Sequence, residues 1–463
     1  MNNKEPSFWS SLRAGLRGEE RDYTSGRLGW AVALLAIPMV LEVSMQAVFE
    51  VVDIFFVGRL GAEAVAAAGL TQGLLALIYA AATGLSMATT AVVSRRIGER
   101  KGEEASRAAG QGLLLALLAS LPFTLAGILF PRQLLLLMGA TPQVAELGMG
   151  FCALTLGGSA SVILLFVLNA VFRGAGDAAV AMRILWLANL LNIILDPIFI
   201  FDWGLGWGVT GAAAATLVGR STAIVIQLIL LWRGHGRVGL NGAYLRIQPA
   251  LMRRMMRLAG TGILQYLVST ASWLAMVRIV AIFGSQAVAG YTIAVRLVIF
   301  AILPSWGLGN AAATLVGQNL GAKQPDRAEK SVWITSVWSV CFLALTAAVY
   351  LVGAGWMIRL FTDNPQVIAI GSYSLRIFSS SYVFLAATIV FSQAFNGAGD
   401  TWTPTWINFL GYWLLQVPLA YLFAVPLGLG ENGVFYAIAL AQATLAVVFL
   451  QMFRRGGWKL REV

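Results

Sequence analysis

The chain has 463 residues, of which 59% are hydrophobic and only 11% are charged, and its mean hydropathy is +0.78. These values exclude an ordinary soluble domain, about a quarter of whose residues are charged, and indicate a polytopic membrane protein. The net charge of +11 would suit a nucleic-acid partner, but the basic residues gather in alternate loops, as membrane topology requires, so we expect no nucleic acid.

Six apolar stretches fill the first half of the chain, and each is about as long as the 20 or so residues that a helix needs to cross a hydrocarbon core. A basic leader at residues 1–28 precedes them. It lacks the apolar core and cleavage site of a signal peptide, so we expect it at the cytoplasmic membrane surface. The predicted helices, which together form a first lobe at residues 29–233, fall near residues 29–57, 64–94, 108–131, 143–172, 178–203 and 208–232.

The second half of the chain repeats the first. The motif FRGAGD, which ends at Asp177, returns as FNGAGD, which ends at Asp400, 223 residues later. After a glycine-rich, basic linker at residues 234–252, the repeat predicts a second lobe of six helices at residues 253–455 and a cytoplasmic tail at residues 456–463.

Six helices per copy is an even number, so both copies should share one orientation and be related by an axis along the membrane normal. We therefore predict an all-α integral membrane protein of about twelve transmembrane helices, with two pseudo-symmetric six-helix lobes around a central cavity. The basic loops place both termini in the cytoplasm, so we expect a multi-pass protein of the cell (inner) membrane. The only histidine, His235, falls in the linker, where we expect a solvated loop residue and no metal site.

Ionisable residues inside the predicted helices are functional candidates, because a charge at the bilayer centre costs about 2.5 to 3.5 kcal/mol. The acidic ones are confined to the first lobe. With a rise of 1.5 Å per residue, Asp53, Asp196 and Thr216 all lie about 8 to 12 Å below the outer surface. Asn192 lies one turn from Asp196 on the same helix face.

Two carboxylates, an amide and a hydroxyl at matching depth are oxygen ligands suited to Na⁺ or to holding a proton. We therefore predict a cation-coupling site at Asp53, Asn192, Asp196 and Thr216, with H⁺ or Na⁺ as the coupling ion and no other cofactor. The alternative is that both acids are structural and are satisfied by neighbouring polar groups. The residues do not choose between H⁺ and Na⁺, since the same ligands suit both.

A further set of polar residues is expected to line the substrate cavity or to gate it. Depth predicts two ion pairs: Glu42 with Arg220 near mid-membrane, where a structural role is as good an explanation as substrate contact, and Glu50 with Arg278 as an outward gate. The candidates for the cavity or gate are Gln46, Glu50, Asn189, Arg220, Arg278 and Arg296.

Several motifs in a fixed order resemble the multidrug and toxic compound extrusion (MATE) transporters over nearly the whole chain. They are PMVLEVSMQAVFEVVDIFFVGRLGAEAVAAAGL, VVSRRIGERK, FRGAGD and LNIILDPIFIF. The resemblance implies two lobes in a V around a central cavity, and export of organic, mostly cationic and amphiphilic compounds in exchange for H⁺ or Na⁺. Similarity to the prokaryotic DinF-like branch implies that Asp53, Asn192, Asp196 and Thr216 couple that exchange.

Unlike NorM-like members of that family, the chain has no acid inside the membrane on its second-lobe helices, where Gln265 and Ser269 stand instead, so coupling through the first lobe is favoured. Two other functions stay open: a flippase of lipid-linked precursors, whose phosphate the second-lobe arginines would bind, and an exporter of an anionic metabolite. We do not expect an enzyme, because no acid and base pair or metal-ligand set faces one space. We expect a monomer whose partners are small-molecule substrates and the lipid bilayer.

Overall fold

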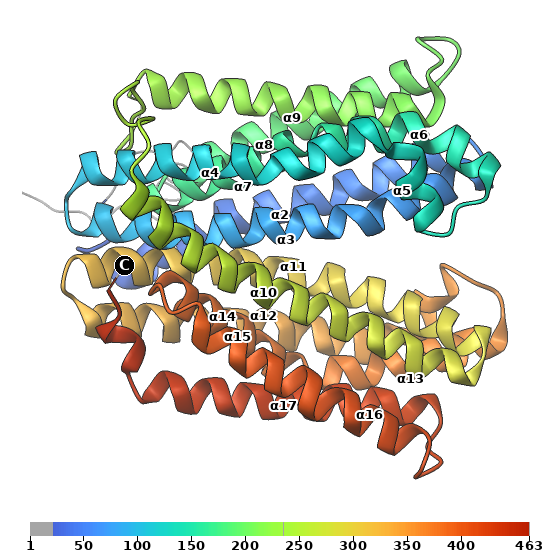
Figure 1. Ribbon diagram of the computed structural model, residues 1–463. Helices are drawn as coiled ribbons and strands as arrows, with labels where there is room; N and C mark the ends of the chain where they lie inside the picture. Colours follow the sequence, from blue (N-terminus) through green and yellow to red (C-terminus); the bar gives the residue numbers. More distant parts are fainter. Residues whose placement is uncertain (1–21, 235, 463) are drawn as a thin grey trace, which may run out of the picture.

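The computed structural model describes residues 22–234 and 236–462, and these form two helical lobes that lie side by side (Figure 1). The described ranges contain α-, 3₁₀- and π-helices and no strand. Most of the predicted leader, residues 1–21, and His235 of the linker lie outside them.

The first lobe comprises the helices up to the linker. Its fourth span, expected as one helix, is interrupted at Gly158 between α6 and α7. The helices are α2 (Leu28–Gly58), α3 (Ala62–Gly98), α4 (Gly102–Leu129), α5 (Pro131–Leu137), α6 (Pro142–Gly157), α7 (Ser159–Ala175), α8 (Ala178–Ile200) and α9 (Gly208–Trp232).

The second lobe repeats the order of the spans after the linker, but the continuous α12 stands in place of α4 and α5, and short 3₁₀- and π-helical segments are added. These elements are α10 (Pro249–Val280), η1 (Ala281–Phe283), α11 (Ser285–Gly321), α12 (Pro325–Arg359), α13 (Pro365–Ser380), α14 (Tyr382–Gly397), α15 (Trp402–Phe409), η2 (Leu410–Gln416), α16 (Val417–Ala424), α17 (Glu431–Arg454) and η3 (Gly457–Leu460).

The repeat is visible in the helix bounds themselves. Both ends of α11 lie 223 residues after the ends of α3, and α13 stands in the same relation to α6. The break in the fourth span recurs at the same offset, at Ser381 between α13 and α14. The copies differ in their fifth span, where α8 is one continuous α-helix but its counterpart contains the π-helical η2 between α15 and α16.

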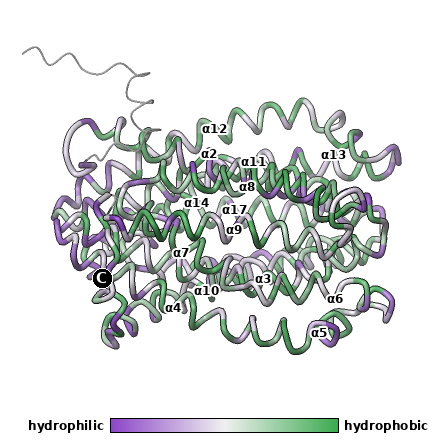
Figure 2. Tube along the Cα trace, turned by 90° about the horizontal axis from the view of Figure 1, so that it is seen from above, coloured by the Kyte–Doolittle hydropathy of each residue, from purple (hydrophilic) through white to green (hydrophobic). Residues whose placement is uncertain are grey.

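Eleven helices in the described ranges, or twelve when the bent pair α13 and α14 is taken as one span, are long and apolar enough to cross a membrane. Figure 2 shows hydrophobic residues along the middle of the bundle and hydrophilic residues gathered toward its ends. The prediction of about twelve transmembrane helices in two six-helix lobes is confirmed.

Close glycine contacts join the lobes at one end of the bundle. We call this the basic end: it carries the α3–α4 turn, the linker, the α11–α12 turn and the C-terminus, and the opposite end is the far end. A Cβ on Gly98 of α3 would lie 2.0 Å from the main-chain oxygen of Gln318 on α11. A Cβ on Gly321 of α11 would lie 2.2 Å from the main-chain oxygen of Arg95 on α3. The two contacts are repeat-equivalent, so α3 and α11 cross here symmetrically.

A second symmetric pair of contacts lies nearer the middle of the bundle. A Cβ on Gly84 of α3 would lie 2.5 Å from the main-chain oxygen of Ala259 on α10. A Cβ on Gly307 of α11, the repeat-equivalent of Gly84, would lie 2.7 Å from Cα of Val40 on α2. These contacts require glycine, because any side chain would force the paired helices apart.

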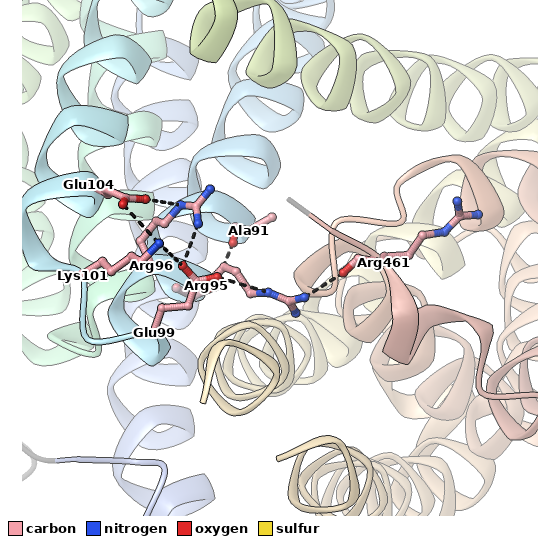
Figure 3. Close-up of polar contacts among 8 residues, drawn as sticks. Ala91, Arg95, Arg96, Glu99, Lys101, Glu104 and Arg461 are labelled. Carbon is pink, nitrogen blue, oxygen red and sulfur yellow. Dashed lines mark hydrogen bonds and ion pairs between the residues drawn. The ribbon is translucent and has the colours of Figure 1, made fainter. Parts of the chain in front are cut away.

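Polar contacts also close the basic end. Arg95 of α3 donates from Nη2 to the main-chain oxygen of Arg461 at 2.7 Å, so the first lobe is bonded to the segment that follows α17 (Figure 3). The guanidinium of Arg461 lies 3.4 Å from the carboxylate of Asp400 in its own lobe. Gln318 of α11 donates to the main-chain oxygen of Gly174 on α7 at 2.9 Å.

Beyond the glycine contacts, toward the far end, α2 and α11 are separated by an apolar groove. Its lining comes from both lobes, and consists of Ser44, Ala47, Val48, Val51 and Val52 of α2 with Phe300, Leu303 and Pro304 of α11. The lobes are therefore packed together at the basic end and separated along this side of the far half.

Candidate functional site

Asn192 connects Asp196 to Thr216 inside the first lobe. Asn192 and Asp196 lie one turn apart on α8, and Thr216 lies on the neighbouring α9. In the amide orientation that satisfies both neighbours, the Asn192 nitrogen donates to Asp196 Oδ2 at 3.0 Å, and its oxygen accepts from the Thr216 hydroxyl at 3.1 Å. Asp196 is completely buried, so this amide supplies its carboxylate with a donor that water cannot supply.

Asp53 approaches the same group from α2. Its Oδ1 is buried and has no hydrogen-bond partner in the part of the chain that the structure describes. Asp53 is near enough for its charge to act on Asp196. Two carboxylates repel each other strongly in a medium of low dielectric constant. Hydrogen bonds thus join Asn192, Asp196 and Thr216, and the charge of Asp53 acts on this group, an arrangement that a bound cation would stabilise.

Glu42 is buried, and its ion-pair partner is Arg173 of α7, so the predicted pairing with Arg220 was wrong. Glu42 Oε1 accepts from Arg173 Nη1 at 2.8 Å and from Asn169 Nδ2 at 3.3 Å. The physical reason is rotation: depth in the membrane does not fix the face of a helix that a residue occupies, and Glu42 lies on the face of α2 that meets α7.

The Glu42–Arg173 pair belongs to a polar network across four helices. Arg173 also donates to Ser86 of α3 at 3.2 Å, and Gln227 of α9 donates to Asn169 at 2.7 Å. Arg173 and Gln227 were not among the residues predicted from the sequence. The available signal was the spacing of Asn169 and Arg173, which puts two polar side chains one turn apart on one face of an otherwise apolar helix.

Arg220 lies instead beside Tyr79 of α3, with 3.5 Å between its Nη2 and the tyrosine hydroxyl. Its charge acts on both Glu50 and Asp53. The predicted outward gate between Glu50 and Arg278 is not formed in this structure, because no ion pair joins them among the described residues. Arg278 lies in the last turn of α10, at the far end, beyond the contacts that hold the lobes together.

The other candidates for the cavity or gate do not join the coupling group. Gln46 is half-buried and Glu50 exposed, one turn apart on α2. Asn189 is buried on α8, and its Nδ2 has no partner within the described ranges. Arg278 and Arg296 are exposed on the second-lobe helices α10 and α11.

Each lobe matches the same family model separately. The model of the MatE family matches residues 38–198, which lie in the first lobe, and residues 262–422, which lie in the second. The chain belongs to the MatE family of transporters. The two matched segments correspond to the two copies of the internal repeat, so the family resemblance seen in the sequence is confirmed.

MatE-family relatives cover nearly the whole chain. A probable multidrug resistance protein NorM of Thermotoga maritima is 24% identical over 434 residues, which are 93% of each chain. A multidrug export protein MepA of Staphylococcus haemolyticus is 23% identical and covers 91% of this chain and 92% of its own. An FAD transporter of Shewanella oneidensis is 26% identical and covers 86% of this chain and 88% of its own.

Solved MATE structures superimpose on both lobes together. A MATE protein crystallised in complex with MaL6 superimposes with a TM-score of 0.89 and 26% identity, covering 96% of this chain and 99% of that one. A MOP superfamily transporter from Pyrococcus furiosus superimposes with a TM-score of 0.88 and 26% identity, covering 99% and 100%. This MatE protein is therefore a multi-pass membrane transporter with the two-lobe fold of its family.

Proposed function

We propose that the protein is a secondary active antiporter that exports amphiphilic, mostly cationic organic compounds in exchange for H⁺ or Na⁺. One observation carries the proposal: the buried Asp196 is bonded to Asn192, and the charge of Asp53 on α2 acts on it. Two acids placed together inside the membrane are costly unless a cation compensates them. Relatives named for multidrug export support organic compounds as the substrates.

Antiport follows if the coupling ion and the substrate compete for the same carboxylates. A cation that enters from the far end would neutralise Asp53 and Asp196, so a cationic substrate would lose its attraction to the first lobe and leave. The oxygens of Asn192 and Thr216 are hard ligands that suit Na⁺ as well as a proton-sharing pair. The membrane potential would contribute about 2.3 kcal/mol per charge per 100 mV to this exchange.

The proposal includes an orientation. Cytoplasmic loops of membrane proteins carry an excess of basic residues, so the basic end is assigned to the cytoplasm of a cell whose inner membrane holds the protein, and both termini are assigned to the same side. The conformation described here, packed at the basic end, would then face outward. A monomer suffices, since the proposed site is built within one lobe, and first-lobe coupling is the pattern of the DinF-like branch.

Efflux of a fluorescent organic cation from energised vesicles, with Na⁺ and H⁺ gradients imposed separately, tests the function. We expect one gradient to drive efflux and the Asp53→Asn variant to lose it. The variant should still fold, because Asp53 Oδ1 makes no hydrogen bond that folding would lose.

Asp202→Asn is the matched control, because Asp202 is an exposed acid in the loop that follows α8 of the same lobe. This control should keep wild-type efflux. Full gradient-driven efflux by Asp53→Asn would refute coupling at Asp53, and no efflux of any cation under either gradient would refute the antiporter.

A second candidate function is export of an anionic metabolite. It is favoured by the relative named as an FAD transporter and by Arg220, a basic group inside the first lobe whose charge acts on Glu50 and Asp53. An anionic fluorophore in the same assay distinguishes this candidate from cation export.

A further inference from the structure

Two segments at the basic end are each bonded to the lobe across from their own. The segment after α17 continues from the second lobe, and the main-chain oxygen of its Arg461 accepts from Arg95 of the first lobe at 2.7 Å (Figure 3). The segment before α2 belongs to the first lobe and is bonded to Arg327 of α12. That guanidinium donates to the main-chain oxygens of Ser25 at 2.7 Å and Gly26 at 2.9 Å. Separating the lobes at this end would therefore break both crossings.

Each segment is also anchored to its own lobe, in both cases at the repeated motif GAGD. Tyr23 is buried, and its hydroxyl donates at 3.3 Å to the main-chain oxygen of Gly176 in the first copy of the motif. The guanidinium of Arg461 lies 3.4 Å from the carboxylate of Asp400, the last residue of the second copy. Because each segment is held to its own lobe, it would move with that lobe and away from its partner across the interface.

The crossing at Arg95 lies directly beside the closest packing between α3 and α11. The preceding residue, Ser94, is completely buried, and a Cβ on Gly317 of α11 would lie 1.9 Å from its Oγ. Both crossings join a charged donor to main-chain oxygens, and hydrogen bonds from an ionised donor are about twice as strong as neutral ones. They therefore add directional bonds to an interface that is otherwise held by close packing of small residues.

We propose that the bonds from Arg95 to the segment after α17 and from Arg327 to the segment before α2 form a latch, which holds the basic end closed and releases when the protein opens there. Contacts made in only one of two conformations favour that conformation, so the latch sets how often the basic end opens. This inference rests on the proposed export function, because an exporter that works by alternating access has to open at each end in turn.

Alkylation of a buried thiol measures how often the basic end opens. Ser94→Cys, combined with Cys341→Ser to remove the exposed thiol, places a thiol against Gly317, where a maleimide reaches it only when the lobes separate. When opening and closing are fast relative to alkylation, the labelling rate is proportional to the open population. Cys152 is buried within the first lobe, so its labelling, resolved by mass spectrometry, reports unfolding instead.

Each half of the latch can be removed separately. Arg327→Met removes one donor and should raise the labelling rate of the introduced thiol about tenfold, the effect of losing a charge-assisted hydrogen bond. A chain that ends at Lys459 keeps the buried Trp458 but lacks the acceptor on Arg461, and should give a similar rise. Both changes together should raise the rate about a hundredfold, because the two bonds share no residue. Lys330→Met, the matched control, removes an exposed basic residue of the same helix α12 and should keep the original rate.

Unchanged labelling in both Arg327→Met and the shortened chain would overturn the latch. So would an equal rise in Lys330→Met, which would assign the effect to surface charge, or a parallel rise at Cys152, which would assign it to lost stability. None of these rates depends on transport. If they rise as expected but the wild type moves no organic cation under either gradient, the export function fails, and the latch remains a contact that holds the two lobes together.

Discussion

Glu42 and Arg173 form a buried ion pair in the first lobe, with 2.8 Å between Oε1 and Nη1. The residues 223 positions later, Gln265 and Asn396, are both neutral. In the second lobe Gln265 donates instead to Ser392 at 3.0 Å. The same place in the fold thus holds an ion pair in one copy and a neutral hydrogen bond in the other, so the lobe can be built without charge there.

Arg173→Asn should destabilise the protein strongly, because it leaves Glu42 buried without a compensating charge. We expect the free energy of unfolding to fall by about 3 kcal/mol, as when one partner of a buried pair is removed. Thermal unfolding of the purified protein in detergent measures the loss.

The double variant Glu42→Gln with Arg173→Asn gives the first lobe the two neutral residues that the second lobe has at the equivalent positions, Gln265 and Asn396. It should recover most of the stability lost by Arg173→Asn, because no buried charge then remains unpaired. A double variant no more stable than Arg173→Asn would show that charge compensation is not the reason for the loss.

The fold could be predicted from the sequence because a lipid bilayer restricts the backbone structures that can cross it. A spanning segment must satisfy its backbone internally, so length and hydropathy suffice to identify a helix. The internal repeat then supplied the relation between the halves. What the sequence did not reveal is local: the breaks at Gly158 and Ser381 and the π-helical η2 depend on packing between helices, which hydropathy does not report.

The candidate site was partly predictable for a similar reason. The depths of Asp53, Asp196 and Thr216 follow from counting residues along helices. In the structure Asn192 joins Asp196 to Thr216, and the charge of Asp53 acts on Asp196. The partner of Glu42 could not be found in this way. Residue counting gives only the depth of a side chain in the membrane. The rotation of α2 relative to α7 makes Arg173, and not Arg220, the partner of Glu42, and this rotation depends on how the side chains of both helices pack.

A large side chain at Gly84 should change which conformation the transporter prefers. Gly84→Leu would place atoms where α3 now touches Ala259 of α10, so the basic-end packing would be strained by about 1 to 3 kcal/mol, the usual cost of overpacking. The population packed at the basic end should fall about 5- to 150-fold relative to the population packed at the far end.

Spin labels at Ala62 and Ser285, the exposed and repeat-equivalent first residues of α3 and α11, measure this change. They require Cys341→Ser, because Cys341 is exposed whereas Cys152 is buried. The label-to-label distance should shorten in Gly84→Leu. Gly260→Leu is the control, since a Cβ at Gly260 meets nothing within 4 Å, and an equal shift in both variants would contradict the explanation.

The segment after α17 should contribute to stability through Trp458. This side chain is buried, stacks on Phe453 with 4.9 Å between ring centroids, and donates from Nε1 to the main-chain oxygen of Phe453 at 3.0 Å. Trp458→Ala should lower the free energy of unfolding by about 3 to 5 kcal/mol. Leu460→Ala, in the same segment but exposed, should leave the unfolding temperature unchanged, and similar losses in both would mean that burial of Trp458 is not the cause.

Thr216 should tune the affinity for the coupling ion through its hydroxyl, which is bonded to Asn192. Thr216→Val keeps the shape but removes the oxygen, so we expect the half-saturating concentration of the coupling ion in the efflux assay to rise about fivefold, the effect of one hydrogen bond or ligand worth about 1 kcal/mol. Thr216→Ser keeps the oxygen and should behave like the wild type. Thr222→Val is the matched control on α9, because the Thr222 hydroxyl donates to the carbonyl of Val218 in its own helix. An unchanged ion dependence in Thr216→Val would remove Thr216 from the coupling site and leave the two carboxylates with Asn192 alone.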